Sequence, residues 1–244
     1  MTRDIQRNSE AFQRQISKDR PPIQVDDVAK NWAKAKAYLI NERCISASTV
    51  DMFRQAGKLQ SDKYSNVVML AHDNEGSQRL ADVRSSHDTG KVFKGLVKGS
   101  NRDYCFHLQL GEKCDTVIIF ESSIDLMSWY DIQKSRDTLP DNTLLIATSG
   151  KRSTVPAFMK NVVSSCKLAI IDFDNDKPGN DAANELMVCI GVVKCRREVP
   201  PDGVKDWNVS LQSSKQIKTC KPDASPAPYH EPALALELYS GPRM

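Results

Sequence analysis

The stretches TVIIFESSID, residues 116–125, and KLAIIDFDNDKPGNDAANEL, residues 167–186, decide the fold. Each begins with a short run of apolar, mostly branched residues, continues into acidic residues and then takes on a helical pattern. Similar patterns predict a strand at 144–148, a helix at 156–163 and a last strand at 192–199. Strands this apolar, each followed by a helix, are typical of a parallel sheet covered on both faces. We therefore expect an α/β fold with a small parallel sheet between helices.

Acidic residues follow three of the predicted strands. Glu121 ends the first strand, Asp172, Asp174 and Asp176 end the third, and Asp206 comes soon after the last. In an open α/β sheet, ligands bind at the carboxyl ends of the strands. Carboxylates that crowd there repel one another unless protons or a cation intervene, and Mg²⁺ is a usual cation for oxygen ligands that also meet phosphate. The pattern predicts a Mg²⁺ (or Mn²⁺) site at this edge.

Simpler interpretations exist for each acidic group taken alone. Glu121 precedes a predicted helix, where a negative charge interacts favourably with the helix dipole. Asp174 to Gly179 reads DNDKPG, which is also ordinary turn sequence. The order of the groups along the chain, rather than either group alone, favours a functional site.

On these residues the chain resembles the primase-like TOPRIM proteins of plasmids and conjugative elements. FESSID at 120–125 resembles the first TOPRIM motif, and DNDKPGNDAA at 174–183 resembles the second. GVKDWNVSL at 203–211 resembles the last motif. Further similar segments are ATSGKRS at 147–153, YLINERCIS at 38–46, NVVMLAHDNEG at 66–76 and FKGLVKGS at 93–100. The resemblance implies a TOPRIM-type sheet preceded by a basic α+β domain.

The resemblance also implies roles for the acidic residues. Glu121, Asp174 and Asp176 are expected to bind the metal, and Glu121, Asp125 and Asp206 are expected to serve catalysis. Glu121 would act as metal ligand or general acid/base, with Asp125 one helical turn along supporting it. Three further residues near these acidic side chains also receive expected roles. We expect Lys205 to contact phosphate, Asn208 to fix the loop and Asp172 to stay peripheral.

The activity implied is Mg²⁺-dependent phosphodiester chemistry on nucleic acid, foremost primase-like nucleotidyl transfer linked to DNA replication or mobilisation. A carboxylate and metal site can position either a nucleotide or a water molecule, so a nicking nuclease is the first alternative. A non-catalytic nucleic-acid-binding module is the second. Asp172-Phe173-Asp174 after an apolar strand also suits an aspartate-dependent phosphatase, with Asp172 as its nucleophile. A phosphorylation receiver domain also has acidic residues at strand ends, but it would not explain the basic N-terminal half of the chain.

The charge of the chain is divided along its length. Residues 1–114 hold 19 Lys and Arg against 14 Asp and Glu, whereas residues 115–212 hold 11 against 14. The segment between Arg84 and Arg102 is rich in cations that could neutralise backbone phosphates, although lysines on an exposed hairpin edge would look the same. The nucleic-acid-binding residues predicted on this basis are Arg84, Lys94, Lys98 and Arg102, together with Lys205.

The sequence divides into four segments. We expect a polar arm at 1–25, the basic α+β nucleic-acid-binding domain at 26–114, the TOPRIM domain at 115–212 and a loose tail at 213–244. The expected partners are single-stranded DNA, nucleoside triphosphates and a relaxase, helicase or zinc-ribbon protein, because the zinc ribbon of replicative primases is not encoded here. No apolar run approaches the roughly 20 residues of a membrane span, so we expect a cytoplasmic location and no membrane partner.

Overall fold

The computed structural model describes residues 21–86, 93–152 and 154–219. The first half contains η1 Ala29–Asn31, α2 Trp32–Ala37, η2 Tyr38–Glu42, α3 Ala47–Gln55, β1 Leu59–Ser61, β2 Val67–His72, β3 Gln78–Arg84, β4 Lys94–Leu96 and β5 Phe106–Leu110. The second half contains β6 Thr116–Phe120, α4 Ser123–Ser135, β7 Thr143–Ala147, α5 Ala157–Ser165, β8 Leu168–Asp172, α6 Lys177–Ile190, η3 Val192–Lys194, β9 Cys195–Arg197, η4 Pro201–Gly203 and α7 Trp207–Thr219.

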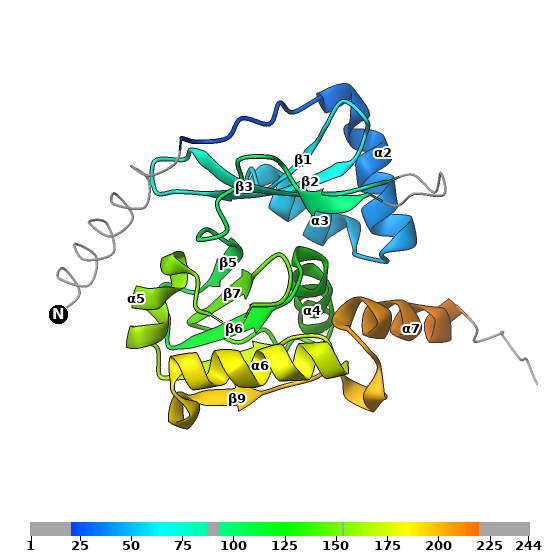
Figure 1. The fold of residues 1–244 in the computed structure, drawn as a ribbon. Helices are drawn as coiled ribbons and strands as arrows, with labels where there is room; N and C mark the ends of the chain where they lie inside the picture. The colour runs from blue at the N-terminus through cyan, green and yellow to red at the C-terminus, as the bar shows by residue number, and fades with distance from the viewer. Residues whose placement is uncertain (1–20, 87–92, 153, 220–244) are drawn as a thin grey trace, which may run out of the picture.

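The N-terminal part is an antiparallel sheet in the order β1-β2-β3-β4, flanked by α2 and α3 (Figure 1). Leu59, Val67 and Met69 face the helices, while residues such as Val68 and Leu70 face the opposite side. The last residues of the expected polar arm lie on that opposite side of the sheet. Ile23 packs there and its backbone N–H donates to Gln78 O, because apolar side chains at the end of the arm can bury themselves on the sheet. Residues 1–20 lie outside the described part.

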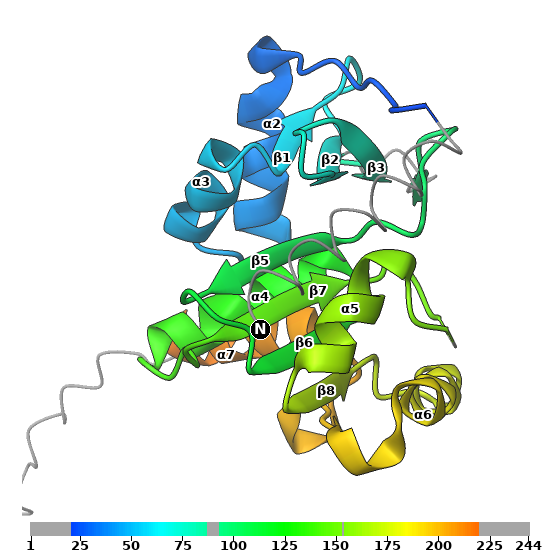
Figure 2. The ribbon, with the colours of Figure 1, turned by 90° about the vertical axis from the view of Figure 1, so that its left-hand side faces the viewer.

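The second sheet has the order β5-β7-β6-β8-β9, and all its neighbouring strands are parallel except β5 and β7. Alternate residues of β6 point to opposite faces. Ile118 and Phe120 pack with α4 and α7, whereas Val117 and Ile119 pack with residues of α5 and α6. Figure 2 shows the helices on the two sides of the sheet. The predicted parallel α/β sheet with helices on both faces is confirmed.

Two expected boundaries differ from the structure. β5 pairs antiparallel with β7 from Phe106↔Ala147 to Leu110↔Thr143, so the second sheet begins before residue 115. Helix α7 continues to Thr219, beyond the expected start of the tail at 213. Lys215, in this last part of α7, attaches the helix to the rest of the protein. Its ammonium group donates to Cys44 O and lies 3.5 Å from Asp131 Oδ2. Residues 220–244 lie outside the described part.

Asp131 on α4 joins the two halves of the molecule. Its buried carboxylate accepts hydrogen bonds from the backbone and hydroxyl of Ser46 and from Thr49 Oγ1 at 2.7 Å. Ser46 is itself the N-cap residue of α3. A single apolar core contains residues of α2, η2, α3, the N-terminal sheet, α4 and one face of the second sheet. This packing fixes the position of the N-terminal sheet relative to the carboxyl ends of the parallel strands. Among the described residues, no helix has both the length and the apolarity that crossing a bilayer requires.

Candidate metal and phosphate site

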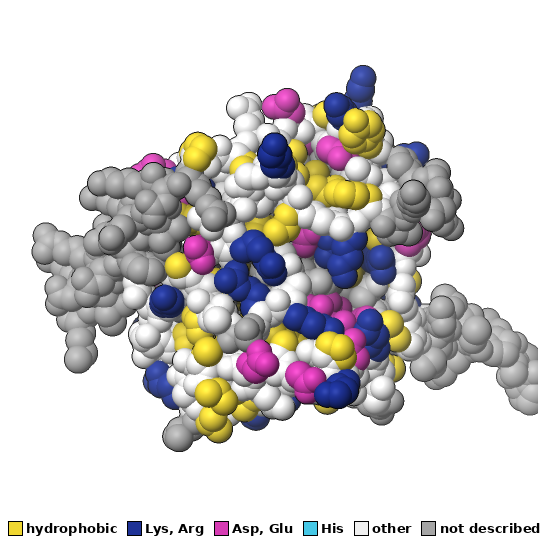
Figure 3. Space-filling model, viewed as in Figure 1, with side chains coloured by type: hydrophobic (Ala, Val, Ile, Leu, Met, Phe, Trp, Pro, Cys, Tyr) yellow, Lys and Arg dark blue, Asp and Glu magenta, His cyan; other side chains and the backbone are white. Residues whose placement is uncertain are grey.

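The acidic residues after β6 and β8 meet at one cavity of about 200 Å³. Glu121 directly follows β6, Asp174 lies two residues beyond the end of β8, and Asp206 precedes α7. Asp125 and Lys205 line the same cavity. From the N-terminal half, Arg43, Arg84 and Lys94 also contribute to its wall. Figure 3 shows Asp and Glu side chains gathered below the N-terminal sheet, with Lys and Arg side chains around them.

Glu121 presents its carboxylate to the cavity because a neighbour takes the capping role. Ser122 is the N-cap of α4, and its hydroxyl accepts a hydrogen bond from the backbone of Asp125. Glu121 Oε2 is buried and makes no hydrogen bond. Burial, and then the nearby charge of Asp174, raise the pKa of Glu121 to about 7. Ser122 rather than Glu121 is thus the capping residue, and the Glu121 carboxylate has an oxygen available for a ligand.

Asp174 and Asp176 differ in their surroundings. Burial, and then the charge of Asp206, raise the pKa of Asp174. Asp176 is the N-cap of α6, where its Oδ1 accepts a hydrogen bond of 2.7 Å from the backbone of Gly179. That bond and the ammonium group of Lys151 lower the pKa of Asp176. Asp176 thus has the turn and cap role of the simpler interpretation and still faces the other carboxylates.

Two lysines supply the positive charge between these carboxylates. Lys151 Nζ lies 3.1 Å from Asp176 Oδ1 and 4.0 Å from Glu121 Oε2. Lys205 Nζ lies 3.7 Å from Asp174 Oδ2 and 3.8 Å from Asp176 Oδ2. As the side chains stand, no three His, Cys, Asp or Glu residues of the described chain are arranged to hold a metal ion. The donors nevertheless fit one, because hard oxygen ligands converge and Glu121 Oε2 is buried without a hydrogen-bond partner.

Asp125 and Asn208 build the wall behind the carboxylates. Asp125 accepts hydrogen bonds from the Ser122 hydroxyl and from the backbone N–H of Asn208 at 3.2 Å. Burial raises its pKa to about 7. The Asn208 amide donates to Arg43 O at 2.8 Å and to Ser128 Oγ at 3.0 Å. Both side chains therefore join the start of α4 to the start of α7.

Asp206 and Asp172 have capping and packing roles. Asp206 Oδ1 accepts a 2.8 Å hydrogen bond from the backbone of Val209, which caps the start of α7, while its side chain still lines the cavity. Asp172 is 1% exposed and accepts a 2.6 Å hydrogen bond from the Trp207 indole. Burial raises the pKa of Asp172 to about 7. The structure thus brings Asp206 to the cavity and places Asp172 behind it.

The predicted basic strip is divided by the fold. Arg84 and Lys94 line the acidic cavity from adjacent strands, and Arg84 is buried against Asp82. Arg102 instead approaches Ser149 O at 3.4 Å, in the loop after β7. Lys98 lies beside Pro21 and Ile23, away from the carboxylates. Residues 87–92 of this strip lie outside the described part.

Sequence reasoning missed Lys151 and Arg43. Lys151 follows Ser149 and Gly150, in a loop at the carboxyl end of a predicted strand, so its position at the same sheet edge was available as a signal. Arg43 belongs to the segment after η2 and reaches the cavity through tertiary packing, for which the sequence contains no local pattern.

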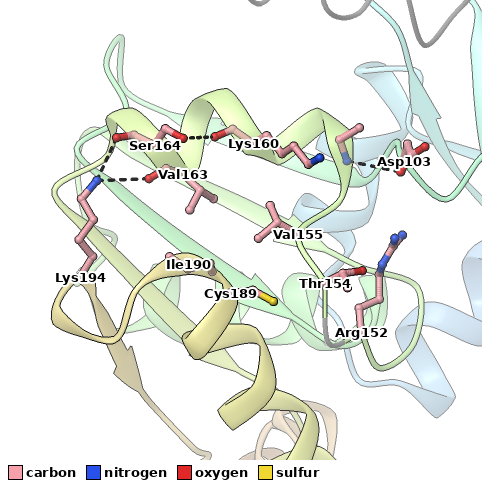
Figure 4. Close-up of a pocket in the computed structure, with 11 residues that line it drawn as sticks. Asp103, Arg152, Thr154, Val155, Lys160, Val163, Ser164, Cys189, Ile190 and Lys194 are labelled. Atoms are coloured by element: carbon pink, nitrogen blue, oxygen red, sulfur yellow. Dashed lines mark hydrogen bonds between the residues drawn. The ribbon is translucent and has the colours of Figure 1, made fainter.

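A larger cavity, of about 660 Å³, lies elsewhere between α5 and the end of α6. Val155, Val163 and Ile190 line it, and the Lys194 ammonium group at one end donates to Ser164 O and Val163 O (Figure 4). The carboxylates that follow β6 and β8 do not line it. Glu121, Asp125, Asp174 and Asp206, predicted from the sequence, line the smaller cavity instead.

Residues 118–211, which include most of the second sheet and its acidic edge, match the family model described as Toprim-like. Residues 37–113 match a family described as "Protein of unknown function (DUF3991)". The T7 primase fragment shares the fold at a TM-score of 0.51 and 21% identity, covering 73% of this chain and 71% of that one. The DnaG catalytic core does so at 0.52 and 14% identity, covering 88% and 77%. Residues 118–211 are thus similar to the Toprim-like family, and the chain shares its fold with primase catalytic cores.

Two curated relatives extend the similarity. An uncharacterized protein of Bacillus anthracis is 32% identical over 167 residues, which are 63% of this chain and 46% of the relative. A "65 kDa protein" of Zymomonas mobilis is 28% identical over 213 residues, which are 83% of this chain and 35% of the relative. The chain thus spans less than half the length of the curated relatives that it matches.

Proposed function

We propose that this protein carries out Mg²⁺-dependent, primase-like nucleotidyl transfer on single-stranded DNA. The observation that carries the proposal is the shared cavity, in which Glu121 and Asp174 face Arg84 and Lys94 of the preceding sheet. Carboxylates suit a divalent cation, and the cationic side chains suit the phosphates of a nucleotide or template. Mg²⁺ or Mn²⁺, held by Glu121, Asp174 and Asp176, would polarise the phosphoryl oxygens.

The residues of the chain supply the remaining steps of transfer. Arg84 and Lys94 bind phosphate, and the Glu121 carboxylate takes the proton of the attacking 3′-hydroxyl. The hydroxyl oxygen bonds to the α-phosphorus as the bond from phosphorus to pyrophosphate breaks. A pKa of about 7 suits this role, because proton transfer is most efficient when the pKa of the base lies near the working pH. Asp125 and Asn208 hold the start of α7 and so position Asp206 and Lys205.

The proposed partners follow from this chemistry. They are single-stranded DNA, nucleoside triphosphates and a relaxase, helicase or zinc-ribbon protein that recognises the template. The proposed setting is the replication or mobilisation of a mobile element in the cytoplasm.

The decisive experiment incubates the purified protein with Mg²⁺ or Mn²⁺, single-stranded template and labelled nucleotides, and in parallel with supercoiled plasmid. We expect new oligonucleotides that depend on template and metal and that disappear in the Glu121→Gln variant. Nicked circles without oligonucleotides would replace the proposal by a nuclease. Template binding without either product would leave a non-catalytic binding module.

A further inference from the structure

The loop between β7 and α5 is fixed to the end of β6 and aims one lysine at the acidic edge. The backbone N–H of Gly150 donates to Glu121 O at 2.8 Å, and the Thr148 hydroxyl contacts Phe120 O at 3.1 Å. Ser149 and Gly150 have φ values of 54° and 108°, the first of them in a region that non-glycine residues rarely adopt. This sharp turn places Lys151 over the carboxylates, so a strained local conformation serves the position of a single side chain.

Lys151 bridges the two acidic motifs. Its ammonium group contacts Asp176 of the second motif at 3.1 Å and Glu121 of the first at 4.0 Å. The Lys151 side chain is 31% exposed, whereas that of Lys205 is 59% exposed and pairs only with the second motif in these contacts. Lys151 is therefore the more enclosed of the two cations, and it contacts carboxylates that would hold a metal ion.

An ammonium group and a divalent cation cannot share those oxygens without strong repulsion. A lysine side chain has a flexible four-carbon stem, so the ammonium group can move by several ångström while its backbone stays in place. Its backbone is held by the Gly150 and Thr148 hydrogen bonds. After displacement, the ammonium group remains at the edge of the cavity, where it can meet a phosphate oxygen.

We propose that Lys151 is a phosphate-binding residue of this site, which holds Asp176 and Glu121 while the metal is absent and moves to a substrate phosphate when the metal binds. This inference rests on the proposed metal-dependent function and adds to it a residue with two alternating partners. In the metal-free protein Lys151 keeps both acidic motifs in place, so the site is preorganised before the metal binds.

The proposal predicts that one substitution at Lys151 raises the affinity for metal and lowers the affinity for nucleotide. Lys151→Met keeps most of the side-chain volume but removes the competing charge, so the affinity for Mn²⁺ should rise about fivefold. The affinity for a non-hydrolysable nucleoside triphosphate analogue, adenosine 5′-(β,γ-imido)triphosphate with Mn²⁺, should fall at least about tenfold, because a charged hydrogen bond is lost. Both affinities are measured by titration calorimetry on the full chain.

Two further variants complete the experiment. Lys151→Arg retains a cation and should restore much of the analogue affinity. Lys167→Met makes the same change in charge at an exposed ion pair with Asp115, before β8, and should leave both affinities unchanged. Circular dichroism would verify that each variant folds.

Weaker Mn²⁺ binding by Lys151→Met would overturn the proposal and give Lys151 a purely structural role. Unchanged analogue affinity in Lys151→Met would also overturn it, since no phosphate contact would then have been lost. Failure of the proposed function itself has a different signature, because the wild-type protein would then bind no Mn²⁺ at all.

Discussion

The indole N–H of Trp207 donates a 2.6 Å hydrogen bond to Asp172 Oδ1 in the interior of the domain. Asp172 ends β8 and lies two residues before Asp174, while Trp207 is the first residue of α7 and follows Asp206 directly. This single bond therefore joins the strand that precedes the second acidic motif to the last motif. It also explains how two segments that lie 35 residues apart bring carboxylates to one cavity.

Divalent metal binding should depend on Asp174. We expect Asp174→Asn to lower the affinity for Mn²⁺ by at least about tenfold, and Asp174→Asn with Asp176→Asn to abolish binding, because the amides remove the ligand charge. Calorimetric titration measures both. Asp181→Asn is the matched control, since Asp181 lies on α6 and pairs with the exposed Lys177. Unchanged affinity in the double variant would rule out the metal site.

Binding to single-stranded DNA should depend on salt, with unequal contributions from the basic residues. Lys94 lines the acidic cavity, whereas Lys98 lies beside Pro21. We expect Lys94→Ala to lower the slope of log K against log salt by about 1 and Lys98→Ala to leave it nearly unchanged. Fluorescence anisotropy at several salt concentrations measures the slopes. If both variants bind like the wild type, the strip is only a solvated surface.

The stability of the metal-free protein should fall as the pH rises. Burial raises the pKa of Glu121 from 4.5 to about 7, so between these pH values the folded protein holds a proton that the unfolded chain releases. Stability is therefore greatest below pH 4.5 with respect to this group and is lost as the pH approaches 7, by on the order of 3 kcal/mol at most. Asp125 and Asp172, whose pKa values are also raised to about 7, add to the same trend.

Thermal unfolding in a chelator between pH 4.5 and 7.5 measures this effect. The Glu121→Gln variant should show a shallower decline, since it cannot ionise at this position. Added Mg²⁺ should raise the melting temperature most above pH 7, where the carboxylates are charged and can bind it. A melting temperature of the metal-free wild type that rises steadily over this range would contradict the assignment of buried, protonated carboxyls.

Asp131→Ala should destabilise the protein by about 2 to 4 kcal/mol, because it leaves buried donors of Ser46 and Thr49 without an acceptor. Urea unfolding followed by circular dichroism measures the loss. Glu185→Ala, at an exposed position of α6, should change stability by less than about 0.5 kcal/mol. Equal stabilities of the two variants would show that the Asp131 network does not hold the two halves together.

Much of the fold could be predicted because β6, β7 and β8 are mainly apolar and the helices carry local signals. Ser46 and Gly57 flank α3, and the turn from Asp73 to Gly76 joins β2 to β3, so residue types that favour caps and turns stand at the ends of these elements. Pairing partners were harder to predict. β5 has the alternating pattern of a strand, but its partner β7 lies more than 30 residues away, and local periodicity does not reveal that choice.

The candidate site could be predicted in part for a similar reason. Strand ends are local features, so Glu121 and Asp174 were found, and topology brings them together. Lys151 was missed since it follows a strand without an acidic neighbour. Lys98 was grouped with Lys94 by sequence proximity alone, although the two residues lie on different sides of the N-terminal sheet region. The direction of a side chain after a strand depends on tertiary packing, which local sequence patterns do not predict.

The chemistry of the site can be tested through two carboxyl groups that rival mechanisms use differently. A phosphatase would require Asp172 as an exposed nucleophile that forms an aspartyl-phosphate. In the structure Asp172 is 1% exposed, and one of its oxygens accepts the Trp207 hydrogen bond. Glu121, by contrast, has a buried oxygen without a hydrogen-bond partner in the cavity that Asp174 also lines.

Asp172→Asn should therefore retain most of the metal-dependent activity on nucleic acid, because the amide oxygen can still accept the bond from Trp207. Glu121→Gln should lose about 10²-fold or more, since the amide can neither take a proton nor contribute charge to a metal ion. Steady-state assays of oligonucleotide synthesis with both variants, and of phosphate release from a small phosphomonoester, distinguish the mechanisms. The phosphatase would be favoured if Asp172→Asn lost activity, Glu121→Gln kept it and the wild type released phosphate from the phosphomonoester. Only that mechanism makes Asp172 the covalent nucleophile.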